Sequence, residues 1–117
     1  MFTRGFMLDT SAINRIHDWQ QCPWSLRGPL YVTDIQLQEL SHTPDPDRRA
    51  SLLSLGRVMP LIAASMGLRV EKYFPDALIA EAALTSNLTL VTADRRLAKV
   101  GRSFGAHVEE IPRTSSV

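Results

Sequence analysis

Short apolar runs alternate along this chain with longer segments in which apolar residues recur at helical spacing. Each run is bounded by turn residues, which predicts short buried strands. The predicted strands cover residues 6–8, 30–32, 88–92 and 107–111. The predicted helices cover residues 12–20, 34–41, 77–86 and 94–100, with a further helix carrying Leu52, Leu53 and Leu55. Strands and helices therefore alternate throughout the sequence.

Capping residues define where several of these helices begin and end. The expected N-terminal caps are, in chain order, Thr10 or Ser11, Thr33 in a capping box with Gln36, and Asp47. Pro60 is expected to end the leucine-bearing helix and to begin another that ends near Gly67. Gly101 is expected to stop the helix that starts at Asp94.

The order of elements predicts an α/β fold in three layers, with helices around a short parallel sheet of four to five strands. A length of 117 residues suits one domain with one core. We expect residues 1–113 to form that single domain and residues 114–117 to be a frayed C-terminal tail.

Composition excludes several classes of protein. With 44% hydrophobic and 21% charged residues, the chain is typical of globular proteins and not of disordered ones. Cys22 is the single cysteine, so no internal disulfide is available, and the three histidines are too scattered for a zinc motif. No apolar run is long enough for a signal peptide or a membrane span, so we expect a cytoplasmic protein without a membrane segment.

Four acidic residues are predicted to meet at one edge of the sheet. They are Asp9 directly after the first strand, Glu39 on the helix after the second, Asp76 in the first turn of the alanine-rich helix, and Asp94 two residues past the strand 88–92. In an open parallel sheet the active crevice lies beyond the carboxyl ends of the strands. Clustered carboxylates raise each other's pKa unless a cation lies between them, and oxygen ligands suit Mg²⁺ or Mn²⁺. The pattern therefore predicts a divalent-metal site.

Each of these residues also has a purely structural interpretation. Asp9 and Asp94 could simply cap the helices that follow them, and Asp76 could serve only to oppose a helix dipole. Glu39 lies between Leu37 and Leu40 on a helix and could be a solvated charge. Capping and metal binding are not exclusive, so both interpretations stay open for the sequence alone.

The four acidic positions and their neighbours resemble the motifs of PIN-domain nucleases, and most closely those of the VapC-like toxins of toxin–antitoxin pairs. The segments that carry the resemblance are Leu8–Ile13, Val32–Thr33 with Glu39–Leu40, Asp76–Ala80 and Leu90–Asp94. They occur in the family's order and span about residues 6 to 111. The resemblance therefore covers nearly the whole chain.

The resemblance implies a metal-dependent endoribonuclease in which Asp9, Glu39, Asp76 and Asp94 hold one or two Mg²⁺ or Mn²⁺ ions. It implies that Asp9 and Asp94 are direct ligands, with Asp76 and Glu39 holding a second ion or ordered waters. Thr92 matches a hydroxyl position that supports the site, and Ser11 stands where relatives often carry Asn. The implied partners are an RNA substrate, a small antitoxin protein and a second copy of the chain in a homodimer.

Two departures from the family pattern bear on function. The segment between Glu39 and Asp76 is shorter than in these toxins, where it carries part of the antitoxin and dimer surface. The helix after Asp94 begins Arg95-Arg96 where many relatives carry an aspartate and a phenylalanine. A non-toxin or weakly catalytic PIN domain that binds or processes RNA is therefore the alternative. A phosphoryl-acceptor module with Asp9 as nucleophile is disfavoured, because it lacks the second acid and the late lysine that such sites need.

The net charge of the chain becomes informative when the four acids of the predicted site are counted separately. The chain carries 13 basic and 12 acidic side chains, for a net charge of +1. If four acids fill one site, 13 basic groups face 8 acidic ones elsewhere, an excess that would attract RNA. The cations expected to contact phosphates are Arg95, Arg96, Lys99 and Arg102; a solvated basic helix face is the alternative.

Overall fold

The computed structural model describes residues 5–21, 26, 28–61 and 75–112. Its elements are, in chain order, β1 (Phe6–Leu8), α1 (Thr10–Trp19), β2 (Leu30–Tyr31), α2 (Asp34–Leu40), α3 (Pro46–Arg57), α4 (Pro75–Thr85), β3 (Thr89–Thr92), α5 (Arg95–Ser103) and β4 (Val108–Glu110). The helix predicted to follow Pro60 falls, beyond Leu61, outside the described residues, as does the predicted tail.

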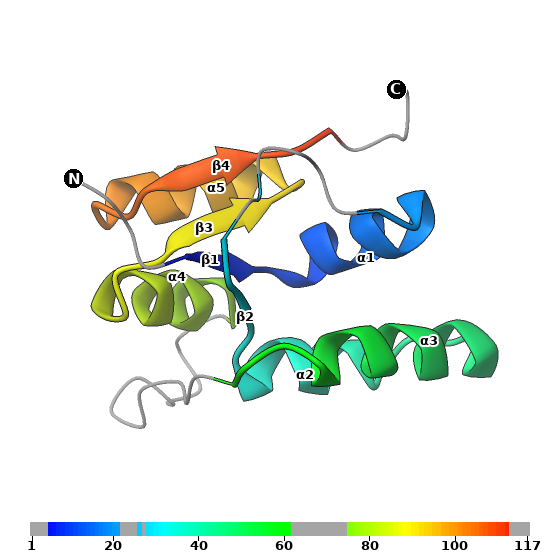
Figure 1. Ribbon diagram of the computed structural model, residues 1–117. Coiled ribbons are helices and arrows are strands. Elements are labelled where there is room, and N and C mark those ends of the chain that lie inside the picture. Colours follow the sequence, from blue (N-terminus) through cyan, green and yellow to red (C-terminus); the bar gives the residue numbers. More distant parts are fainter. Residues whose placement is uncertain (1–4, 22–25, 27, 62–74, 113–117) are drawn as a thin grey trace.

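Within the described part of the chain, four parallel strands form the sheet, in the order β2-β1-β3-β4 (Figure 1). The chain leaves β1 toward β2 on one side and then crosses to β3 on the other side of β1. Connections that diverge in this way leave a crevice at the carboxyl ends of β1 and β3, where ligands of open α/β sheets bind. The predicted α/β fold with a four-stranded parallel sheet is confirmed.

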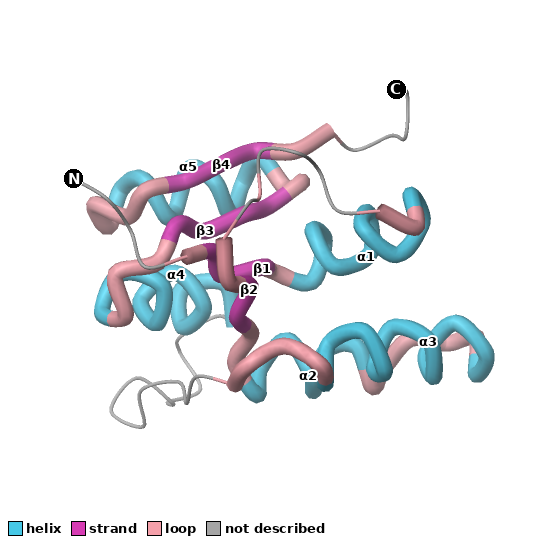
Figure 2. The backbone as a smooth tube through the Cα atoms, viewed as in Figure 1, coloured by secondary structure: helices cyan, strands magenta, loops and turns pink. Residues whose placement is uncertain are grey.

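Helices cover both faces of the sheet (Figure 2). Successive strand residues point to opposite faces, so Leu8 and Val91 pack with α1 and α3, whereas Met7 and Leu90 pack with α4 and α5. All four of these side chains are fully buried. Burying each one contributes about 1.5–3 kcal/mol, so strands of two to four residues suffice to anchor the helices.

Two helix caps differ from the prediction. Asp9, rather than Thr10 or Ser11, caps α1, and its Oδ1 accepts a hydrogen bond of 2.8 Å from the Ala12 amide. Asp45, rather than Asp47, caps α3, because Pro46 occupies its first turn and needs no donor partner. The capping box of Thr33 and Gln36 at the start of α2 is confirmed.

Gly101 does not stop α5, which continues to Ser103. A Cβ atom at Gly101 would lie 3.0 Å from the side chains of both Leu90 and Val108. The glycine is therefore explained by close packing of the helix on β3 and β4. The left-handed backbone that ends the segment belongs to Gly105, with φ of 88°. No helix within the described parts of the chain is long and apolar enough to cross a membrane.

Candidate functional site

A cavity of about 570 Å³ opens beside the carboxyl ends of β1 and β3. It is lined by Asp9, Thr10, Ser11, Asn14, Arg15, Glu39, Asp76, Ile79, Ala93 and Asp94. All four acidic residues singled out in the sequence therefore line one cavity, although they come from four separate elements. We call this feature the carboxylate cavity.

Asp9 is the most deeply placed of the four carboxylates, with 4% of its surface exposed. Its Oδ1 accepts hydrogen bonds of 2.8 Å from both the Ala12 amide and the Ser11 hydroxyl, and its Oδ2 accepts one of 2.8 Å from Thr92. Burial raises the pKa of Asp9 to about 6; the hydrogen bonds oppose this rise, and the nearby charge of Asp76 adds to it. Asp9 is thus a fixed carboxylate whose charge the protein alone stabilises poorly.

Two hydroxyls join Asp9 to the chain that follows β3. The Ser11 hydroxyl accepts a hydrogen bond of 2.9 Å from the Ala93 amide while it donates to Asp9. The Thr92 hydroxyl accepts one of 2.9 Å from the Asp94 amide while it donates to Asp9. The backbone that presents Asp94 is therefore tied to the aspartate at the end of β1. The Asp94 Oδ1 in turn accepts a bond of 2.8 Å from the Arg96 amide and caps α5.

Glu39 reaches the cavity from α2 and is half-buried. The Thr10 hydroxyl donates a hydrogen bond of 2.6 Å to its Oε1, which fixes the carboxylate against α1. Burial raises the pKa of Glu39; the bond from Thr10 opposes the rise and the charge of Asp76 adds to it. Thr10 was expected only as a cap. Its partner lies 29 residues away, so no local pattern could reveal this role.

Asp76 lies in the first turn of α4, and neighbouring charges of both signs influence its pKa. Burial and the neighbouring Asp94 raise the pKa of Asp76, whereas the positive charge of Arg96 lowers it. Asp9, Glu39 and Asp76 therefore all hold their protons more tightly than free carboxylic acids do. A bound cation would reverse that tendency by favouring the charged forms.

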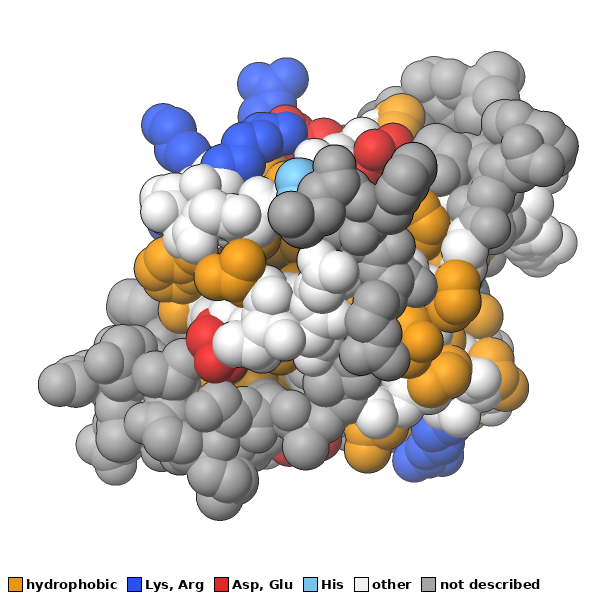
Figure 3. All heavy atoms as spheres, turned by 60° about the vertical axis from the view of Figure 1, so that its left-hand side comes forward, with side chains coloured by type: hydrophobic (Ala, Val, Ile, Leu, Met, Phe, Trp, Pro, Cys, Tyr) orange, Lys and Arg blue, Asp and Glu red, His pale blue; other side chains and the backbone are white. Residues whose placement is uncertain are grey.

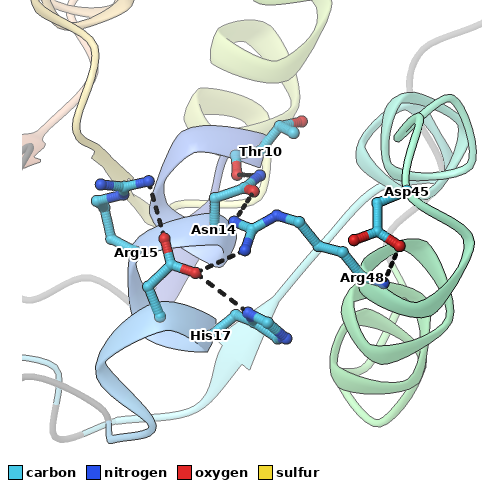
Figure 4. A network of polar contacts seen from close by, with 7 residues as sticks. Thr10, Asn14, Arg15, His17, Asp45 and Arg48 are labelled. Atoms are coloured by element: carbon cyan, nitrogen blue, oxygen red, sulfur yellow. Dashed lines mark hydrogen bonds and ion pairs between the residues drawn. The ribbon is translucent and has the colours of Figure 1, made fainter.

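Asn14 and Arg15 also line the cavity, and sequence reasoning missed both. They belong to a polar network between α1 and α3 that centres on Asp18 (Figure 4). Arg15 and Arg48 form ion pairs with Asp18 at 3.0 and 2.8 Å. Hydrogen bonds from Arg48 and His17, together with the charges of Arg48 and Arg15, lower the pKa of Asp18.

The same network reaches the cavity wall through Asn14. The guanidinium of Arg48 donates a bond of 2.7 Å to the Asn14 side chain, which itself donates one of 2.9 Å to the Thr10 carbonyl. Because Thr10 also holds Glu39, three helices are connected through consecutive hydrogen bonds. The packing of α1 on α3 brings the side chains of Asn14 and Arg48 together, and sequence spacing alone does not encode this contact.

The donor set suits a hard divalent cation, although it does not form a complete cage. Within residues 5–21, 26, 28–61 and 75–112, no three His, Cys, Asp or Glu side chains are grouped closely enough to hold a metal together. The closely packed cluster expected from the sequence is thus looser in the structure. Mg²⁺ often uses one or two carboxylates and completes its shell with waters and substrate phosphates, so a cavity lined by four carboxylates fits this ion.

Comparison with known proteins identifies the family to which the chain belongs. The family model described as PIN domain matches residues 6–103, from β1 to the end of α5, and the chain therefore belongs to the PIN domain family. PIN domains are generally nucleases. A comparison with curated protein sequences gives no match.

Three solved structures share the fold. The PIN domain endonuclease Utp24 has a TM-score of 0.67 at 14% identity, over 91% of this chain and 84% of that one. A domain of a functionally unknown protein from Methanocaldococcus jannaschii has a TM-score of 0.63 at 12% identity, over 96% and 94%. PAE2754 from Pyrobaculum aerophilum has a TM-score of 0.56 at 20% identity, over 89% and 83%. At such identities the likeness concerns the fold alone.

Proposed function

We propose that this protein is a divalent-metal-dependent endoribonuclease whose active site is the carboxylate cavity. The observation that carries the proposal is the convergence of Asp9, Glu39, Asp76 and Asp94 from four elements on one cavity at the crevice of the sheet. Membership of a family of nucleases supports the reaction class. The raised pKa values of Asp9, Glu39 and Asp76 support a cation as the missing partner.

The acidic and hydroxyl-bearing residues of the carboxylate cavity each have a defined part in such a site. Asp9 and Asp94 would hold Mg²⁺ or Mn²⁺ directly, with Glu39 and Asp76 holding a second ion or the ordered waters. When bound, the ion supplies an activated water and stabilises negative charge on the phosphate and the leaving oxygen. Ser11 and Thr92 orient Asp9, and Thr10 orients Glu39.

The alternative use of Asp9 as a phosphoryl-accepting nucleophile fits the site poorly. Both of its carboxylate oxygens already accept hydrogen bonds, and its exposed surface is 4%. A nucleophile must present a free carboxylate oxygen to the phosphorus of its substrate, whereas Ala12, Ser11 and Thr92 engage both Asp9 oxygens in the cavity wall. A positioned metal ligand suits this geometry better.

Cleavage of RNA with and without metal tests the proposal. We expect the purified protein to cleave labelled RNA in Mg²⁺ or Mn²⁺, to lose activity in excess EDTA, and to regain it when the metal is restored. Asp94→Asn should reduce cleavage strongly, whereas Asp47→Asn, an exposed acid in the first turn of α3, should not. Undiminished cleavage in EDTA, or by Asp94→Asn, would contradict the proposed mechanism.

We further propose that the enzyme acts as the toxin of a VapBC-type pair, in the cytoplasm and as a homodimer. The resemblance of its four motifs to VapC-like toxins supports this role. Expression of the wild type should arrest growth, and co-expression of a small protein encoded by an adjacent gene should restore it. Normal growth on expression, with no such neighbouring gene, would instead favour an RNA-processing or RNA-binding PIN domain.

A further inference from the structure

A second hollow of about 570 Å³ lies on α5 and is lined mainly by cations. Its lining residues are Arg95, Arg96, Lys99, Arg102 and Glu110. Figure 3 shows Lys and Arg side chains gathered at the upper end of the molecule, where α5 and β4 lie in Figure 1. We call this feature the basic hollow.

Among the residues that the structure describes, three of the four cations of the basic hollow have no ion-pair partner. Arg102 is paired with Glu110 at 2.9 Å, so the acid of the hollow is already engaged. No ion pair within 4.0 Å involves Arg95, Arg96 or Lys99 anywhere in the described part of the chain. Cations without acidic partners remain available for an anionic ligand. The arginines of the α1–α3 network, by contrast, are held by Asp18.

The placement of two of these cations works against the stability of the helix that carries them. Arg95 and Arg96 occupy the first turn of α5, which contains no acidic residue. Positive charge near a helix N-terminus is unfavourable because it opposes the helix dipole, and here only the Asp94 cap compensates. Residues that violate such a local rule are expected where function requires them.

The basic hollow adjoins the carboxylate cavity. Asp94 lines the cavity and caps the helix whose next two residues line the hollow. A polyanion in a cavity lined by four carboxylates and one arginine meets repulsion, which an adjacent cluster of cations offsets.

We infer that the basic hollow binds the backbone phosphates of the RNA strand beside the bond that the carboxylate cavity cleaves. This inference rests on the proposed function and adds the direction in which the substrate leaves the site, along α5. Residues 95 to 102 rise about 10 Å along the helix. Because arginine and lysine would contact phosphates rather than base edges, the hollow contributes affinity without sequence preference.

Binding measured without cleavage tests this inference. The probe is a 5′-fluorescein-labelled single-stranded RNA of mixed sequence, and its anisotropy is followed with the full chain in excess EDTA. Lys99→Gln should weaken binding about 3-fold and the double variant Arg95→Gln/Lys99→Gln about 10-fold. The slope of log affinity against log salt should fall by about 0.7 for each lost contact. Arg57→Gln, an exposed arginine in the last turn of α3, is the control and should bind as wild type does.

Two further readouts separate a binding role from a structural one. The double variant should unfold at the wild-type temperature or slightly above it, because Arg95→Gln removes a positive charge from the start of α5. In cleavage assays with Mg²⁺ it should show a raised KM at an unchanged kcat. Unchanged RNA affinity and salt dependence in the double variant would overturn the inference, whether or not RNA is cleaved.

Failure of the proposed function would give a different result. If no metal supports cleavage but the double variant still loses RNA affinity, the nuclease proposal fails and the hollow remains an RNA-binding surface. An acidic peptide serves as a second probe. If the double substitution weakens binding of that peptide and leaves RNA binding intact, the hollow belongs to a protein partner and the inference is wrong.

Discussion

The two sides of the carboxylate cavity are built differently. On the side formed by β1, α1 and the end of β3, Asp9 is buried and is held by three hydrogen-bond donors. On the side formed by α4 and the start of α5, Asp76 and Asp94 are only partly buried. Burial and neighbouring charges govern the pKa of Asp76, and no hydrogen bond from the described part of the chain contributes to it.

This difference separates two requirements of a metal-dependent site. A fixed carboxylate defines where a cation sits, because its position does not change when the ion leaves. Partly exposed carboxylates can instead adjust to the ion, to its waters and to the substrate phosphate. The Asp9 side therefore supplies geometry, and Asp76 on the other side supplies adaptable charge.

The largest expected effect comes from removing the charge on the fixed side. Asp9→Asn keeps the side-chain shape and its acceptor for the Ala12 amide, so the fold should persist. Cleavage of RNA should nevertheless fall at least about 1000-fold, equivalent to about 4 kcal/mol of transition-state stabilisation. Initial rates in saturating Mg²⁺, with thermal unfolding as the check on folding, measure this. A variant that folds and retains more than a tenth of the activity would remove Asp9 from the active site.

The next largest effect should follow from loosening Asp9 without removing it. Thr92→Val deletes the donor to Asp9 and leaves the Asp94 amide without its acceptor. We expect a loss of activity of about 10–100-fold and a loss of about 1–3 kcal/mol in the free energy of unfolding. Thr85→Val is the matched control, because among the described residues the Thr85 hydroxyl bonds only to the backbone of its own helix. Equal effects of the two substitutions would show that the Thr92 hydroxyl has no special role.

A smaller effect is expected on the adaptable side. Asp76→Asn removes a charge that no hydrogen bond from the described residues fixes, so activity should fall about 10-fold, less than in Asp9→Asn. The pKa of Asp9 should decrease, because the charge of Asp76 raises it in the wild type. NMR titration of the Asp9 carboxyl carbon in metal-free protein measures this change. A loss of activity equal to that of Asp9→Asn would mean that the two sides do not differ in function.

The last expected effect concerns the stability of the metal-free protein rather than its activity. The folded-state pKa of Asp9 is about 6 against an ordinary value of 3.8, so the folded protein binds this proton more tightly. This contribution to stability is complete below about pH 4 and is lost as the pH rises through 6. The stability of the wild type relative to Asp9→Asn is the difference between their free energies of unfolding. This difference should therefore increase, by at most about 3 kcal/mol, as the pH falls from 7.5 to 4.

Urea denaturation in EDTA across this pH range measures the difference. The variant removes the contribution of Asp9 and leaves those of other groups, such as Asp18, whose lowered pKa acts in the opposite direction. A difference that stays constant with pH would show that Asp9 titrates normally. Added Mg²⁺ should stabilise the wild type at pH 7.5 and have little effect at pH 4.

Sequence patterns predicted the parts of the molecule that depend on local order. The apolar runs located the four strands, and the rule that crevices lie at strand ends selected the four acids that line the cavity. The sequence favoured Thr10 or Ser11 as the cap of α1 and left Asp9 open for that role, because all three are good capping types; Asp9 serves both as the cap and as a cavity carboxylate. Gly101 was misjudged because its role is to admit β3 and β4 side chains, which only the packed sheet reveals.

Other parts depend on contacts that no spacing rule specifies. The bond from Thr10 to Glu39 and the pairing of Arg48 with Asp18 connect residues about thirty positions apart. Glu110 is the last residue of β4, which follows α5 in the sequence, and it forms an ion pair with Arg102 of that helix. This pair engages one of the four cations expected to contact phosphates. These contacts follow from how α1, α2 and α3 pack together and from the pairing of β4 beside β3.

The hydrogen bonds of the Ser11 and Thr92 hydroxyls also affect the local unfolding of the protein. The amides of Ala93 and Asp94 lie between β3 and α5, in a connection that would normally exchange its protons rapidly. Both donate to side chains that are themselves anchored on Asp9. Their hydrogen exchange should therefore be as slow as that of the β1 and β3 amides, because exposing them requires the two strands to separate. The site would then lose its shape only when the centre of the sheet unfolds.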